Sequence, residues 1–137
     1  MKSKELSVKD SKVKIWTSRI LSTVGAAFLV FDSITKILGV KQVVDGTVEL
    51  GYSHQLVPII GVLLLVFSIL YIIPRTRMIG LLLLTGYLGG AVATHFRVGS
   101  PLLTHILFPV YISLLLWVGF YLREESLKAV IPFWKAK

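Results

Sequence analysis

The chain has 137 residues, of which 55% are hydrophobic, and it carries a formal net charge of +8. Its mean hydropathy of +0.79 exceeds that of an ordinary soluble domain, and its positive charge lies mainly in the two terminal segments, so the pattern indicates a membrane protein and not a nucleic-acid-binding one. The absence of cysteine excludes disulfides, thiolate metal sites, iron–sulfur clusters and thiol–disulfide relays.

The N-terminal segment, residues 1–14, is polar and basic, and it predicts a cytoplasmic tail that is disordered in part. The first span is expected from about residue 15 to residue 38, a length that crosses a bilayer at about 1.5 Å per residue. Trp16 and Arg19 suit the entry interface, and Gly39 suits the helix end. The apolar run is too long for the core of a signal peptide, so we expect a retained helix.

Residues 40–55 are more polar, but four valines recur there at helical spacing: Val40, Val43, Val44 and Val48. They predict a short interfacial or re-entrant helix that ends at Gly51. Three further spans are expected at residues 57–73, 78–96 and 102–122, the first of them opened by Pro58. Because the connections are short, consecutive spans should be antiparallel neighbours. We therefore predict an all-α, integral membrane four-helix up-and-down bundle that forms a single domain, 1–137.

Basic residues predict the orientation of this bundle. The N-terminal segment through Arg19, the second connection and the C-terminal tail together hold twelve lysines and arginines, whereas the first and third connections hold two. The richer side should be cytoplasmic, so both termini are expected in the cytoplasm and the chain in the inner membrane. The tail at residues 123–137 mixes charges with apolar side chains, and it is expected to lie on the membrane surface.

Charged side chains within a span are costly and need a reason. Asp32 and Lys36 stand four residues apart near the outer end of the first span, where they share a helix face and can pair. His95, Arg97 and His105 flank the turn between the third and fourth spans. The topology brings all five to one depth in the outer leaflet, which makes them candidate ligand-binding residues. A structural ion pair and an interfacial cluster that reaches water are the alternative interpretations.

The chemistry of this group favours a lipophilic ligand over a metal ion. Two histidines lack a third zinc ligand unless Asp32 or Glu49 serves, and histidines that flank one turn suit haem poorly, so we predict no metal site. Histidine titrates near neutrality, and a proton relay from either histidine to Asp32 would suit a quinone, whose carbonyls take up protons on reduction. Lys36 and Arg97 would polarise such carbonyls or hold an anionic head group.

The third span contains two pairs of small residues at the spacing that lets membrane helices approach closely, Gly86 with Gly90 and Gly89 with Ala93. We predict that they pack within the bundle or across a homodimer. Five aromatic residues are candidates either for lining a lipophilic pocket or for anchoring the chain at the interface: Tyr52, Tyr87, Tyr111, Trp117 and Tyr121.

The most distinctive stretch of the chain is Gly-Gly-Ala-Val-Ala-Thr-His-Phe-Arg at residues 89–97. Further stretches accompany it in order: residues 31–36, 49–52, 73–76, 85–88, and His105 with residues 108–111. Together they resemble the DoxX-like family of small four-span membrane proteins, from about residue 20 to residue 132. The resemblance implies a four-helix bundle of the inner membrane. A relative associated with a terminal quinol oxidase and a thiosulfate:quinone oxidoreductase gave the family its name, but no catalytic residue carries over.

Three functions fit these observations. The favoured one is a redox-associated accessory that binds a lipophile such as quinone at the five ionisable residues. The second is a structural or assembly subunit of a larger membrane complex. The third is a small proton-coupled transporter built around Asp32, although the neighbouring Lys36 should keep this acid ionised and so oppose proton exchange. The sequence does not decide whether the chain is an enzyme.

Overall fold

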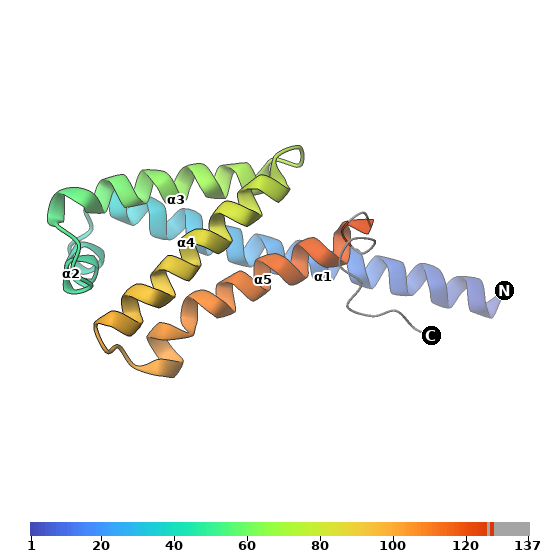
Figure 1. Cartoon of the computed structure of the whole chain (residues 1–137). Helices are drawn as coiled ribbons and strands as arrows, with labels where there is room; N and C mark the ends of the chain where they lie inside the picture. Colours follow the sequence, from blue (N-terminus) through green and yellow to red (C-terminus); the bar gives the residue numbers. More distant parts are fainter. Residues whose placement is uncertain (126, 128–137) are drawn as a thin grey trace.

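A computed structural model describes residues 1–125 and 127 of the chain. Within them the fold consists of α1 (Lys2–Ile37), α2 (Lys41–Glu49), α3 (Val57–Ile72), α4 (Arg77–Arg97) and α5 (Phe108–Arg123) (Figure 1). A 3-10 helix (His54–Leu56) precedes α3, and a π-helix (Leu102–Ile106) precedes α5. The described part holds four helical segments that are long and apolar enough to cross a membrane: Ser7–Ile37, His54–Ile72, Arg77–Arg97 and Leu102–Arg123. The predicted all-α membrane bundle is therefore confirmed.

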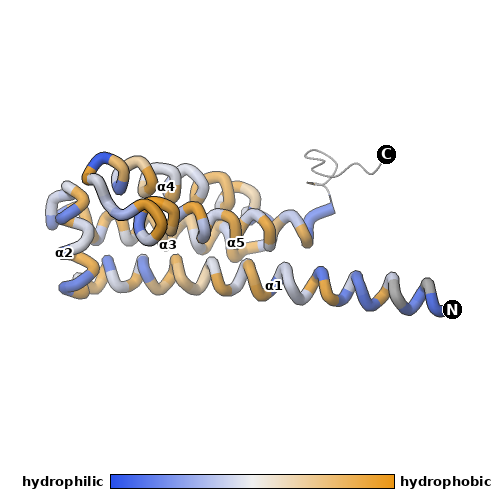
Figure 2. The backbone as a smooth tube through the Cα atoms, turned by 90° about the horizontal axis from the view of Figure 1, so that it is seen from below, coloured by the Kyte–Doolittle hydropathy of each residue, from blue (hydrophilic) through white to orange (hydrophobic). Residues whose placement is uncertain are grey.

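The N-terminal segment differs from the prediction, because α1 begins at Lys2 and not near residue 15. The expectation of a partly disordered tail was wrong. No glycine or proline precedes Gly25, and Lys, Glu and Leu are good helix formers, so a helix already nucleated by the apolar span continues backward at little cost. Figure 2 shows this hydrophilic first part of α1 extending beyond the other helices. The predicted tail on the membrane surface lies largely outside the described residues.

The four spans form a ring in which α1 packs against α3 and α5, and α4 packs against the same two helices. Consecutive spans are thus neighbours and run in opposite directions, as predicted (Figure 1). The core between them is built from fully buried side chains of all four spans, including Leu29, Leu64, Tyr71, Leu84 and Leu116. We call the end of the bundle that carries α2 and the α4–α5 turn the α2 end, and the opposite end, with the α3–α4 turn, the terminal end.

Glycines allow the closest helix contacts, but not the glycines that were predicted to do so. A Cβ atom at Gly80 would overlap the backbone of Tyr71, and a Cβ atom at Gly61 would lie 2.9 Å from the Ser33 carbonyl oxygen. By contrast, no atom of residues 1–125 or 127 lies within 4 Å of such a position at Gly86, Gly89 or Gly90. These three glycines are exposed, as is Ala93. Packing of these glycines within the bundle is therefore a wrong prediction, whereas packing across a homodimer stays a prediction.

The direction of α4 explains why Gly86, Gly89 and Gly90 do not pack against a neighbouring helix. Figure 1 shows that α4 starts beside the end of α3 and diverges from it toward the α2 end. Gly80 lies at the near end, where the two helices touch, and the predicted pairs lie in the diverging half. The short predicted helix is α2, which covers the α2 end with Val44 and Thr47 buried. Gly39 and Gly51, with φ of 69° and 92°, let the chain turn on either side of it.

Candidate functional site

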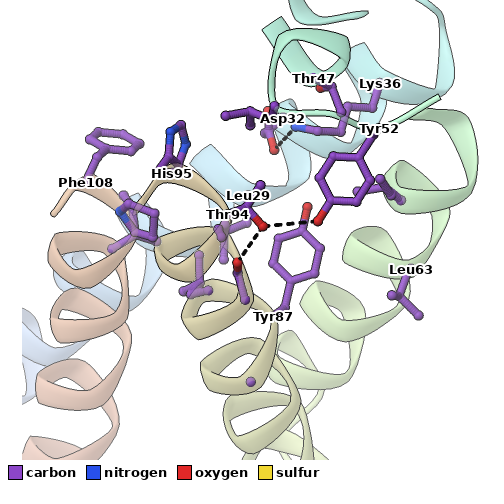
Figure 3. A pocket seen from close by; sticks show the side chains of 18 of the residues that line it. Leu29, Asp32, Lys36, Thr47, Tyr52, Leu63, Tyr87, Thr94, His95 and Phe108 are labelled. Atoms are coloured by element: carbon purple, nitrogen blue, oxygen red, sulfur yellow. Dashed lines mark hydrogen bonds and ion pairs between the residues drawn. The ribbon is translucent and has the colours of Figure 1, made fainter. Parts of the chain in front are cut away.

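A cavity of about 510 Å³ lies between the spans toward the α2 end (Figure 3). Most of its wall is apolar and comes from α1, α3, α4 and α5: Phe28, Leu29, Ile60, Leu63, Leu88, Phe108, Pro109 and Ile112. The open glycine positions Gly86 and Gly90 also line it. A cavity of this size with apolar walls and a few polar groups has the character of a small-molecule site.

The first polar group of this cavity is the pair formed by Asp32 and Lys36 on α1. Lys36 Nζ donates a hydrogen bond to Asp32 Oδ2 at 2.5 Å, and the two side chains are only 12% and 28% exposed, respectively. The predicted pairing is therefore confirmed. Because each charge neutralises the other, the pair can remain within a span at a lower cost than either residue alone.

Three hydroxyl groups form the second polar group. Thr94 Oγ1 donates to the Gly90 carbonyl at 2.8 Å, so the Tyr52 hydroxyl, 3.3 Å away, serves as the donor to Thr94. Figure 3 shows the hydroxyl of Tyr87 pointing toward that of Tyr52. Tyr87 makes no side-chain hydrogen bond to another described residue. Every fully buried polar side-chain atom in the described part has a hydrogen-bond partner, so the Tyr87 oxygen remains accessible to a ligand.

The two histidines lie together at the α2 end, beside the α4–α5 turn. Their ring centroids are 5.9 Å apart, which confirms the prediction that the turn brings them to a similar depth. His95 Nδ1 is 3.0 Å from Ser100 Oγ. A second hollow of about 580 Å³ adjoins the cavity, and Asp32, Lys36 and His95 border both, whereas His105 and Glu49 border only the second.

Arg97 stands apart from the other four predicted residues. Its Nη2 donates to the Leu50 carbonyl at 2.7 Å, and its guanidinium lies over Gly51. Arg97 borders neither hollow. Residues two positions apart on a helix point in nearly opposite directions, which separates Arg97 from His95. The guanidinium thus fastens α4 to the segment that carries Tyr52.

The aromatic candidates divide between the cavity and the rest of the molecule. Tyr52 and Tyr87 line the cavity, Trp117 and Tyr121 pack against the core, and Tyr111 is 44% exposed. The sequence analysis missed Phe28, Thr47, Thr94 and Phe108 as lining residues. Phe28 lies one helical turn before Asp32, so helical spacing would have indicated it. Thr94 directly precedes His95, and its position next to a candidate residue was the only sequence signal for it.

The arrangement suits an amphiphile and not a metal ion. Among residues 1–125 and 127, no three side chains of His, Asp or Glu lie close enough together to hold a metal. Instead an apolar chamber ends at a cluster of hydrogen-bond donors and acceptors: Lys36, Tyr87, His95 and the Asp32 carboxylate. Such a site can hold an apolar body within the bundle and orient a polar head toward the histidines.

The comparison with protein families gives one match, in which residues 20–119 fit the model of the DoxX-like family. The match covers the first span through most of the fourth, and it includes every residue of the cavity wall. No curated protein and no solved structure matches the chain. The family match confirms the resemblance predicted from residues 89–97 and the stretches around them.

Proposed function

Because the chain belongs to the DoxX-like family, whose namesake is associated with quinone-dependent enzymes, we propose that it is an accessory of a membrane redox system that binds a quinone-type lipophile at the α2 end. The observation that carries the proposal is the cavity itself. Its apolar walls lead to the Asp32–Lys36 pair, two tyrosine hydroxyls and His95. The count of basic residues supports an orientation with this end in the outer leaflet and the termini in the cytoplasm of an inner-membrane protein.

A quinone head is a ring with carbonyl oxygens that accept hydrogen bonds. Lys36 Nζ and the Tyr87 hydroxyl are donors on the cavity wall, and the tautomer of His95 decides whether its free ring nitrogen donates or accepts. His95 is the group suited to exchange a proton with a bound head near neutral pH. It also borders the second hollow, whose lining includes the exposed residues His105 and Glu49. The role that we propose for the chain is binding and proton access, with electrons supplied by a redox partner.

The first experiment is mass spectrometry of the lipophiles that co-purify with the protein in native lipid particles. We expect the particles that contain the protein to hold more quinone per lipid than the bulk membrane does. His95→Ala should lower this excess, because it removes a polar group from the head region. His54→Ala is the matched control, since His54 is exposed and lines neither hollow. Quinone at the bulk level in the wild-type protein would contradict the proposal.

A second function, assembly into a homodimer or a larger membrane complex, is favoured by the exposed small-residue face of α4. Gly89 and Ala93 lie on this face, and no described residue comes within 4 Å of a Cβ position at Gly89. Close helix packing in a membrane uses such faces. The test compares the oligomeric mass of the wild type with that of Gly89→Leu in native lipid particles. The mass should be lower in the variant.

We do not propose a proton-coupled transporter, because Lys36 holds Asp32 in an ion pair.

A further inference from the structure

A third hollow, with a different chemistry, lies at the terminal end of the bundle. It has a volume of about 520 Å³, and three arginines from three helices line it: Arg19 of α1, Arg77 of α4 and Arg123 of α5. Ser22, Thr23 and Tyr71 add hydroxyl groups to the same wall. None of these residues borders either hollow at the α2 end, so this site is independent of the proposed quinone site.

The fold holds Arg77, the half-buried member of the three, in place. Arg77 Nε donates to the Tyr71 carbonyl at 3.1 Å, and its Nη2 lies 3.3 Å from the Ile72 carbonyl, so the guanidinium caps the C-terminal end of α3. Arg123 lies within electrostatic reach of Arg77, as does the acidic Glu124. The Tyr71 hydroxyl is hydrogen-bonded to Ser22 Oγ at 3.0 Å and donates to the Leu116 carbonyl at 3.1 Å, which fixes the floor of the hollow.

The lining of this hollow holds three arginines and no acidic residue. The Asp32–Lys36 and Lys41–Asp45 salt bridges involve none of these arginines. Two neighbouring guanidinium groups repel each other, so a bound anion would lower the energy of the folded chain. Arginine is also the side chain best suited to bind a phosphate through parallel hydrogen bonds.

The other side of the hollow is apolar and continues toward the middle of the membrane. Along α1 its wall runs from Arg19 through Ser22 and Ala26 to Val30. This spacing of three to four residues is one helix face, and eleven residues at about 1.5 Å each extend roughly 16 Å from the arginine level. Ala26 and Ala27 leave room beside α1, and Ile72 closes the opposite wall.

We propose that this hollow binds the phosphate of an anionic phospholipid from the leaflet in which the chain termini lie. The arginines hold the phosphate, and the small apolar side chains of α1 accommodate the start of an acyl chain. A free phosphate would satisfy the arginines but would leave the apolar continuation empty. Basic pockets between membrane helices on the cytoplasmic side are the expected sites for anionic head groups, and the count of basic residues places this end there.

The experiment is a lipid titration followed by native mass spectrometry of the detergent-solubilised protein. Phosphatidylglycerol and phosphatidylcholine with identical acyl chains are compared, and inorganic phosphate is added as a separate competitor. We expect phosphatidylglycerol to bind more tightly, and Arg19→Gln or Arg123→Gln to weaken its binding about fivefold each, since a basic residue contributes about 1 kcal/mol to anionic lipid binding. Arg75→Gln is the matched control, because Arg75 lies in the α3–α4 connection outside the hollow.

Arg19 and Arg123 are both exposed, so neither substitution removes core packing, and the two variants test the site separately. Unchanged phosphatidylglycerol binding in Arg75→Gln supports the proposal. An equal loss in Arg75→Gln would show that surface charge alone attracts the lipid, and would overturn it. Equal binding of the two lipids by the wild type would overturn it as well. Displacement of the lipid by millimolar phosphate would assign the site to a soluble anion.

Discussion

The two ends of the bundle deal with charge in the membrane in opposite ways. At the α2 end, Lys36 neutralises Asp32 within hydrogen-bond distance, and the pair borders a cavity with apolar walls. At the terminal end, Arg19, Arg77 and Arg123 gather without a salt bridge to another described residue, in a hollow that is lined on one side by small side chains. Paired charge can lie within a span, whereas unpaired charge must stay where lipid head groups or water can reach it.

The two ends of the bundle also differ in how closely α4 packs against its neighbours. The terminal end is held by close backbone contact at Gly80 and by the Ser18 hydroxyl, which donates to the Gly119 carbonyl at 2.5 Å. Toward the α2 end, α4 diverges from α3, and the glycines Gly86 and Gly90 face open space (Figure 1). The comparison indicates that α4 packs closely at the terminal end, whereas its half toward the α2 end leaves room for the cavity.

The largest expected effect comes from a methyl group added at Gly80, compared with one added at Gly86 in the middle of α4. Gly80→Ala should destabilise the protein by about 3 kcal/mol, because the methyl group overlaps the Tyr71 backbone and neither helix can yield. Gly86→Ala should be neutral or slightly stabilising, since its methyl group meets no atom. Thermal unfolding in one detergent compares the two variants. Equal losses of stability would contradict the view that α4 is closely packed only in its half toward the terminal end.

A smaller effect is expected from breaking the ion pair at the α2 end. Lys36→Met should cost about 2 kcal/mol, less than the roughly 3–5 kcal/mol of a fully buried pair, because it leaves the Asp32 carboxylate without its partner. Lys41→Met is the control: the Lys41–Asp45 pair has side chains 86% and 55% exposed, respectively, and exposed pairs contribute little to stability. The free energy of unfolding of both variants checks this. A Lys36→Met protein as stable as Lys41→Met would show that Asp32 reaches water unaided.

The smallest expected effect compares two tyrosine hydroxyl groups. Tyr71→Phe should cost about 1 kcal/mol, because the buried hydroxyl bonds both Ser22 and the Leu116 carbonyl. Tyr52→Phe should cost about 0.5 kcal/mol or less, since its bond to Thr94 is long at 3.3 Å and the side chain is half-buried. Unfolding measurements on the two variants decide the order. The reverse order would place the stabilising polar contacts at the α2 end.

Much of the fold could be predicted because membrane spans leave a strong signal. A run of apolar residues long enough to cross a bilayer has few other uses, and the expected span at residues 57–73 differs by one residue from α3. The Asp32–Lys36 pair was predictable from helical spacing alone. The depth of His95 and His105 was predictable as well, because a short turn leaves the residues on either side at similar height.

Other features depend on packing and leave little trace in the sequence. Arg19, Arg77 and Arg123 are distant along the chain, and only the ring order of the helices brings them to one hollow. The direction of Arg97 depends on the position of Leu50, whose carbonyl it binds. The open face at Gly86 and Gly90 depends on the divergence of α4 from α3. The sequence could not predict it, because the same small-residue pattern occurs on covered and on uncovered helix faces.

The central claim is that the cavity at the α2 end binds a quinone-type lipophile, and filling the cavity tests this directly. Gly90 lines the cavity and Gly89 does not, although both are exposed and both have open space at the Cβ position. The measurement is the affinity for a quinone in lipid particles of defined composition. We predict that Gly90→Phe weakens binding about tenfold or more, whereas Gly89→Phe leaves it unchanged. Equal affinities in the two variants and the wild type would contradict the claim.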